Sequence, residues 1–265
     1  MRKLLDYLLP LAVALLLLGL WEGFVAARQI PPYVLPAPSA IAAALCENWS
    51  GLATAMAATL LITLKGFIGA FIVAVLLAIL FSQSRLAEKA LYPYAVILQV
   101  TPVVAIAPLI LIWVGFERIE LALALIAGMI AFFPMLSNAV QGLKSADFNL
   151  LDLARLYGAS RWQILYRVQL PSALPALLTG MKIGGVIALI GEVTAEFVAG
   201  SGTATGLAWR IVEFGNRLEI PTLFAALALL GATGVAIFAG LSLVEWLLLR
   251  RWHESAISRE NQTSR

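Results

Sequence analysis

Six stretches of about twenty or more mostly apolar residues constrain this chain more than any other feature of its sequence. The hydrocarbon core of a bilayer is about 30 Å thick, and a helix of about 20 apolar residues spans it. None of the stretches alternates apolar with polar residues, as the strands of a membrane β-barrel do. We therefore predict an all-α polytopic membrane protein with six transmembrane helices, at Leu5–Ala26, Met56–Phe81, Pro93–Phe116, Ile119–Val140, Ile183–Gly200 and Thr222–Leu249.

The composition excludes several classes of protein. Only 12% of the 265 residues are charged and 62% are hydrophobic, whereas a soluble domain carries about 25% charged residues. A water-soluble fold would leave large apolar patches exposed. The single cysteine, Cys46, excludes a disulfide within the chain, and with His253 as the single histidine no Cys/His zinc site can form. We predict no metal site.

The positive residues predict the orientation in the membrane. With the N-terminus in the cytoplasm, thirteen of the 18 lysines and arginines fall in cytoplasmic segments and four in external ones. Cytoplasmic loops of membrane proteins carry such an excess. Both termini should therefore face the cytoplasm, and the net charge of +3 needs no nucleic-acid partner to explain it.

The apolar segments and the loops between them divide the chain. The predicted parts are an N-terminal transmembrane helix at 1–28, a proline-rich external connector at 29–55, a core at 56–250 with a cytoplasmic loop at 141–182, and a cytoplasmic tail at 251–265. The N-terminus also resembles a secretory signal, with Arg2 and Lys3 before the apolar run and small residues at Ala26. Cleavage there would leave five spans in the same orientation.

The first half of the long loop at 141–182 predicts a short amphipathic helix. Asp147 or Asn149 can cap its start. The apolar residues that follow have the i, i+3, i+4, i+7 spacing of one helical face, and they are Leu150, Leu153, Ala154 and Tyr157.

The second half predicts a sharp turn and another helix. Gly158 can take a positive φ at the end of the first helix. Ser160 and Gln163 have the spacing of a capping box, and we expect Pro171 to stop the second helix. The loop then forms a cytoplasmic protrusion that fits a groove on a partner protein; the alternative is an interfacial helix lying on the lipid headgroups.

The order of residues in this loop resembles a known signature. Asp152-Leu153-Ala154, three residues, Gly158, nine residues and then Val168-Gln169-Leu170-Pro171 resembles the EAA motif of the permease subunits of bacterial ABC importers. That motif reads Glu-Ala-Ala, three residues, Gly, nine residues and Ile-x-Leu-Pro, so Leu153 departs from its alanine. The segments that look like the nitrate/taurine/sulfonate branch are Pro36–Ser39, Ala107–Phe116, Gly158–Gln163, Leu170–Pro175 and Gly206–Trp209.

The resemblance covers about Trp21 to Trp252 and implies a type I ABC importer fold in the bacterial inner membrane. It implies three partners: cytoplasmic ATPase subunits, an external substrate-binding protein and a second permease, which for this branch favours a homodimer. The chain itself would be no enzyme and hold no cofactor, because ATP would bind the partner; no phosphate loop of the GxxxxGK[ST] kind is present. The residues expected to couple to the ATPase are Asp152, Leu153, Ala154, Tyr157, Gly158, Ala159, Arg161, Leu170 and Pro171.

Polar residues inside the apolar segments are candidates for the translocation path, because an intramembrane charge must face protein or water. Glu192 and Glu196 share one helical face, and Lys65 is a candidate partner for one of them. The further candidates are Gln99, Thr101 and Asn138. For the two glutamates the alternatives are hydrogen bonds to neighbouring helices or a position near the external interface. For Lys65 the alternative is snorkelling to that interface, and for the other three residues it is packing between helices.

Two other functions compete with the ABC permease. A secondary carrier or channel would work without an ATPase, but it would have no reason to build the spacing found at 147–171. An intramembrane enzyme would need a nucleophile beside a base, which this sequence does not offer. The sequence does not identify the solute.

Overall fold

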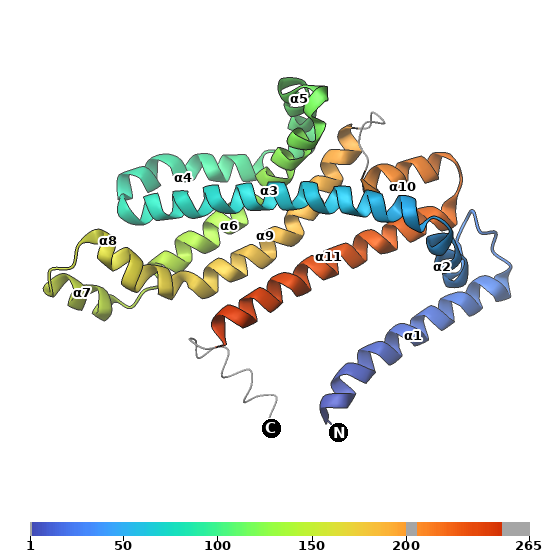
Figure 1. Cartoon of the computed structure of the whole chain (residues 1–265), viewed down its shortest axis with the longest axis horizontal. Coiled ribbons are helices and arrows are strands. Elements are labelled where there is room, and N and C mark those ends of the chain that lie inside the picture. The colour runs from blue at the N-terminus through green and yellow to red at the C-terminus, as the bar shows by residue number, and fades with distance from the viewer. Residues whose placement is uncertain (1, 200–205, 251–265) are drawn as a thin grey trace. The chain divides into compact units, whose positions relative to one another are not determined.

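The structure is a computed structural model that describes residues 2–199 and 206–250, and throughout these residues every secondary-structure element is a helix (Figure 1). The all-α prediction is confirmed. The predicted tail at 251–265 lies outside the described residues. The elements are α1 (Arg2–Arg28), α2 (Pro38–Glu47), α3 (Trp49–Gln83), α4 (Arg85–Val100), α5 (Val103–Val114), η1 (Phe116–Arg118), α6 (Ile119–Lys144), α7 (Phe148–Leu156), α8 (Arg161–Ile164), η2 (Leu165–Gln169), α9 (Leu170–Ala199), α10 (Leu207–Asn216) and α11 (Ile220–Leu249).

The membrane-spanning helices agree in number with the prediction. In the described residues, five helices are long and apolar enough to cross a bilayer, and α4 with α5 makes a sixth span if the bent pair counts as one. Helix α3 has 35 residues and begins at Trp49, inside the segment predicted as an external connector. Nothing between Trp49 and Met56 breaks a helix, so α3 continues beyond the length that the hydrocarbon core requires.

The third predicted span is two helices and not one. Helices α4 and α5 meet at an angle of 101°. Thr101 is extended, with φ −73° and ψ 125°, because the ring of Pro102 disfavours the helical conformation in the residue before it. Pro102 therefore breaks the span that the sequence predicts at Pro93–Phe116.

The chain forms two compact units. The first contains the described residues up to Ala58 together with 206–233. Its core includes the fully buried Leu52, Leu207 and Ala225. The start of α2 is tied to α1, because the backbone N–H and the hydroxyl of Ser39 donate to the Glu22 carboxylate at 3.0 and 2.7 Å.

The second unit contains residues 59–199 and 234–250. Helices α6 and α9 pack along each other (Figure 1), and Gly180, Gly184 and Gly191 of α9 lie against α6. A Cβ atom added to Gly191 would lie 3.0 Å from the Cα of Ala127, so the two backbones approach closely there. Helix α9 also contacts α11 through an ion pair between Lys182 and Glu245.

Gly66 is a second point of close approach, between α3 and α6, and it yields a stability prediction. A Cβ atom at Gly66 would lie 2.4 Å from the carbonyl oxygen of Ala124, whereas one at Gly69 meets nothing within 4 Å. We expect Gly66→Val to lower the melting temperature of the purified protein, through overpacking of about 1–3 kcal/mol. Gly69→Val, three residues along the same helix, is the matched control; equal melting temperatures for the two variants would contradict this packing.

Candidate coupling loop and transport path

The long loop between α6 and α9 forms the predicted helix, turn and helix. Helix α7 (Phe148–Leu156) begins after Asp147, whose carboxylate accepts a hydrogen bond from the Asn149 N–H at 2.8 Å. Of the two predicted caps, Asp147 is therefore the one used. Leu151 is buried and anchors the helix to the rest of the second unit.

Gly158 ends α7 as predicted. Its φ is +72°, a conformation that costs other residues roughly 1–2 kcal/mol. The Gly158 N–H donates to the Arg155 carbonyl at 2.9 Å, and the Ala159 N–H donates to the Ala154 carbonyl at 3.0 Å. These two bonds define a Schellman motif, which fixes the direction in which the chain leaves the helix.

The second helix of the loop starts as predicted but does not stop where predicted. Ser160 and Gln163 form a capping box, with bonds of 2.7 and 3.3 Å. The prediction that Pro171 ends the helix is wrong, because α8, η2 and α9 run continuously from Arg161 to Ala199. The π-helical segment η2 (Leu165–Gln169) shifts the hydrogen bonding just before Pro171: the Leu170 N–H donates to Leu165, five residues back. Pro171 therefore lies inside a continuous helical segment, directly after the π-helical turn, where the regular i→i−4 hydrogen bonding is already interrupted.

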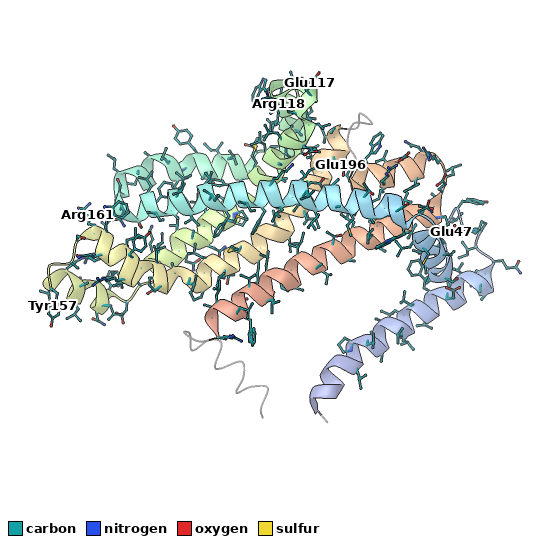
Figure 2. The ribbon with its side chains drawn as sticks, in the orientation of Figure 1. Glu47, Glu117, Arg118, Tyr157, Arg161 and Glu196 are labelled. Atoms are coloured by element: carbon teal, nitrogen blue, oxygen red, sulfur yellow. The ribbon has the colours of Figure 1, made fainter. Side chains whose placement is uncertain are left out.

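The loop exposes a cluster of apolar side chains. Leu156 and Tyr157 are each 84% exposed, and Figure 2 shows Tyr157 at the outer end of the loop. Leu153, Ala154 and Tyr157 line a hollow of about 320 Å³ together with Pro171. The structure therefore brings together residues predicted to couple to the ATPase that lie on both sides of the Gly158 turn. Asp152 is exposed and pairs with Arg155 at 2.8 Å.

Glu192 and Glu196 lie in the packed interior of the second unit. Both side chains are 0% exposed, so the shared face predicted for them points into the helix bundle. Neither carboxylate oxygen of Glu192 has a hydrogen-bond partner among the described residues, and the buried hydroxyl of Thr63 on α3 is unpartnered in the same way. Such groups are rare in proteins because each one costs free energy.

The other residues predicted for the path do not meet these carboxyl groups. Asn138 packs against Gly180 and donates to the Pro134 carbonyl of its own helix at 2.7 Å. Gln99 is exposed near the end of α4, and the Thr101 hydroxyl at the break donates to Ile97. The structure thus places the five candidates at three separate positions, and their role in translocation stays a prediction.

Lys65 pairs with neither glutamate of α9, so the predicted partner is wrong. Its ammonium lies 2.7 Å from the carboxylate of Glu120 at the start of α6. Glu120 follows the break and η1 in the sequence, and only the packing of α3 against α6 brings it to Lys65. Both side chains are more than half exposed.

This ion pair borders a large cavity of about 940 Å³. Its walls come from α3, α4 and α6 and are mainly apolar, with Val73, Leu98 and Phe132 among them. Glu117 and Arg118, labelled in Figure 2, add a second pair of opposite charges. Sequence reasoning missed this cavity; the closely spaced charges Glu117, Arg118 and Glu120 next to an apolar segment were the available signal.

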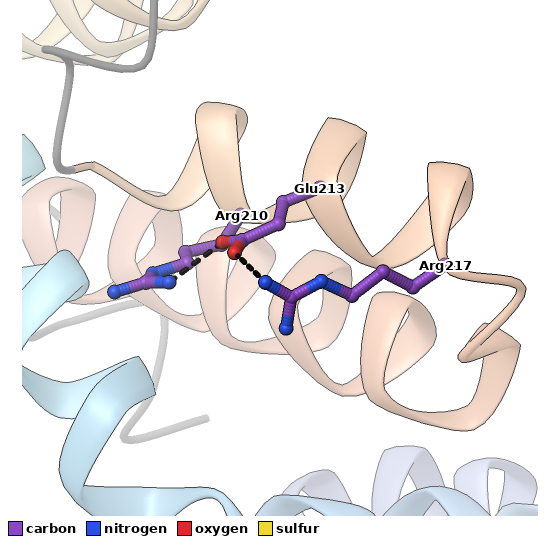
Figure 3. A network of polar contacts seen from close by, with 3 residues as sticks. All are labelled: Arg210, Glu213 and Arg217. Atoms are coloured by element: carbon purple, nitrogen blue, oxygen red, sulfur yellow. Dashed lines mark hydrogen bonds and ion pairs between the residues drawn. The ribbon is translucent and has the colours of Figure 1, made fainter.

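In the first unit, helix α10 (Leu207–Asn216) carries a network of charged side chains. Glu213 accepts from Arg210 at 2.6 Å and from Arg217 at 2.7 Å (Figure 3). Phe214 is buried in the core of this unit. The three charged side chains form one network along the helix surface.

Comparison with known proteins shows the family. Residues 66–252 match the binding-protein-dependent transport system inner membrane components. A riboflavin transport system permease protein of Chloroflexus aurantiacus is 35% identical over 93% of this chain and 90% of its own length. A formylaminopyrimidine transport permease protein of Halalkalibacterium halodurans is 31% identical over 94% and 98%, and a probable ABC transporter permease protein of Haemophilus influenzae is 31% identical over 91% and 95%. Together with the membrane helices and the loop geometry, these matches show that the chain belongs to the family of binding-protein-dependent transport system inner membrane components, the ABC transporter permeases.

Proposed function

We propose that this chain is the permease subunit of an ABC importer and translocates a small solute that an external binding protein delivers. Hydrolysis of ATP on partner ATPase subunits drives the cycle, and the chain itself is not catalytic. A second copy of the chain completes the pore. The observation that carries the proposal is the exposed apolar end of the loop at Leu156 and Tyr157, held by the Schellman turn at Gly158.

The geometry supports a mechanical link between this loop and the membrane. Arg161–Ala199 is one continuous helical segment of 39 residues, so a partner that moves the loop also moves α9. Helix α9 packs along α6, which forms one wall of the large cavity. Closure of the ATPases can therefore bias the bundle between two arrangements. A secondary carrier would not need an exposed apolar protrusion of this kind.

For the solute, we propose a planar nitrogen heterocycle that passes through the large cavity. Apolar side chains dominate the walls, and Lys65, Glu117, Arg118 and Glu120 cancel in charge. A sulfonate would favour a net positive lining. The permeases named for riboflavin and formylaminopyrimidine are 35% and 31% identical to this chain, against 27% and 28% for those named for aliphatic sulfonates in Bacillus subtilis and taurine in Escherichia coli.

Docking can be tested with cysteine crosslinking. The chain has a single cysteine, the exposed Cys46, so Cys46→Ser gives a background without thiols. We expect Tyr157→Cys in this background to crosslink to a co-expressed ATPase subunit through a short bifunctional reagent. Tyr94→Cys is the matched control, because Tyr94 on α4 is 68% exposed but lies outside the loop.

Transport by the reconstituted complex tests the proposed function. Proteoliposomes that contain the permease, its ATPase and its binding protein should take up riboflavin or a related pyrimidine only with ATP, and taurine poorly. Uptake at the full rate without the ATPase would instead support a carrier. Preferential uptake of taurine would contradict the proposal that the solute is a nitrogen heterocycle. It would still agree with the proposal that the chain is the permease of an importer.

A further inference from the structure

A basic hollow lies where the α3–α4 turn meets the coupling loop. It measures about 560 Å³, and its walls are mainly polar. Arg85 comes from the start of α4, while Arg155 and Arg161 come from the two sides of the Gly158 turn. In Figure 2, Arg161 is labelled on the side of the loop that faces the start of α4. Two segments far apart in the sequence thus bring three arginines to the wall of one space.

The charges of this hollow favour an anion. No Asp or Glu lines it. In the part of the chain that the structure describes, Arg155 pairs with Asp152, while Arg85 and Arg161 take part in no ion pair. The N-terminus of the 16-residue helix α4, capped by Ser84, adds a positive partial charge at the same place. Guanidinium groups bind phosphate through paired hydrogen bonds.

A second, more apolar hollow of about 680 Å³ adjoins the first. The two share Ser82, Arg85, Leu151 and Gln169. The second adds the rings of Phe81, Tyr92 and Phe148, and Phe148 is 76% exposed. It also adds Lys89 and the ion pair between Glu88 and Lys144. A basic polar space that continues into a space with an apolar, aromatic side matches an amphiphile with an anionic head.

We propose that the two hollows form a binding site for an anionic phospholipid. The phosphate lies among Arg85, Arg155 and Arg161, and an acyl chain lies along Phe81, Tyr92 and Phe148. The sequence places this end of the helices at the cytoplasmic surface of the membrane, where basic pockets between helices bind anionic headgroups. Because two of the three arginines flank Gly158, a bound lipid holds the coupling loop against the α3–α4 turn.

The test uses the purified full chain in a neutral detergent. We expect phosphatidylglycerol to raise the melting temperature, and phosphatidylcholine with the same acyl chains to raise it much less. Arg85→Gln should weaken the apparent affinity for phosphatidylglycerol about tenfold, because one charged hydrogen-bond donor is lost. Arg250→Gln is the control: it removes the same charge from the end of α11, where Arg250 stacks on Trp246 outside both hollows.

A second variant tests whether the apolar hollow binds the acyl chain. Phe148→Gln changes an exposed side chain, so the fold should tolerate it, and it should weaken binding of the long-chain lipid. Equal shifts with the two lipids, or an unchanged affinity in both variants, would overturn the proposal. A shift with inorganic phosphate alone and none with phosphatidylglycerol would assign the arginines to a free anion. If Arg85→Gln removes ATPase binding and leaves lipid binding intact, the hollow belongs to the ATPase interface, and the lipid site is rejected.

Discussion

Gly158→Val is expected to reduce ATP-driven uptake about tenfold or more, while the protein still inserts into the membrane. A Cβ atom at Gly158 meets nothing within 4 Å, so the loop has room for the side chain. The cost comes from the backbone, since φ is +72° and a β-branched residue is strongly disfavoured there. A penalty of roughly 1–2 kcal/mol changes the population of the turn about 5–30-fold, and Tyr157 then no longer points outward.

A graded series separates this effect from a general loss of stability. Gly158→Asn should keep most of the uptake, because asparagine tolerates positive φ better than other residues. Gly240→Val is the matched control, since Gly240 in α11 also has free space but no positive φ. The measurement is uptake per inserted permease in proteoliposomes with the partner ATPase. Normal uptake by Gly158→Val would remove the turn from the coupling mechanism.

The features predicted correctly depend on short-range interactions. The membrane helices follow from runs of apolar residues, and the turn at Gly158 and the capping box at Ser160 involve residues only a few positions apart. Each of these features depends on residues that are close in the sequence, so it can be predicted without knowledge of the rest of the chain. The helical content and the turn between the two helices of the loop could therefore be predicted from the sequence.

The errors concern interactions that depend on neighbouring residues or on tertiary packing. The prediction that Pro171 ends the helix did not allow for a π-helical segment. This segment shifts the backbone hydrogen bonds before Pro171, so the helix continues. The sequence offers several carboxyl groups that could lie at the same depth in the membrane as Lys65. Only the packing of α3 on α6 determines that Glu120 is its ion-pair partner. The cavity is formed by α3, α4 and α6 together, so no single segment predicts it.

Glu192→Gln is expected to change the rate of uptake about tenfold, with ATPase docking retained and thermal stability equal or higher. The carboxyl group is fully buried, and neither of its oxygens has a partner among the described residues. An unsatisfied buried polar group costs about 1–3 kcal/mol, and more when it is charged. A conformation that lets water or another donor reach Glu192 would recover this free energy, so the carboxyl group favours movement of α9 away from the arrangement described. The amide cannot ionise when water reaches the site, so it weakens that preference and alters the balance between the two states of the transport cycle.

The control for this variant is Thr63→Val. Thr63 is the other buried side chain of the second unit with an unpartnered oxygen, and valine removes its hydroxyl at nearly constant volume without a change of charge. We expect its uptake to stay within about twofold, because an uncharged hydroxyl costs less to bury than a carboxyl group. The experiment compares initial uptake rates and melting temperatures of both variants with those of the unaltered chain. If Glu192→Gln melts at a lower temperature and transports normally, the carboxyl group stabilises the helix packing and does not act in transport.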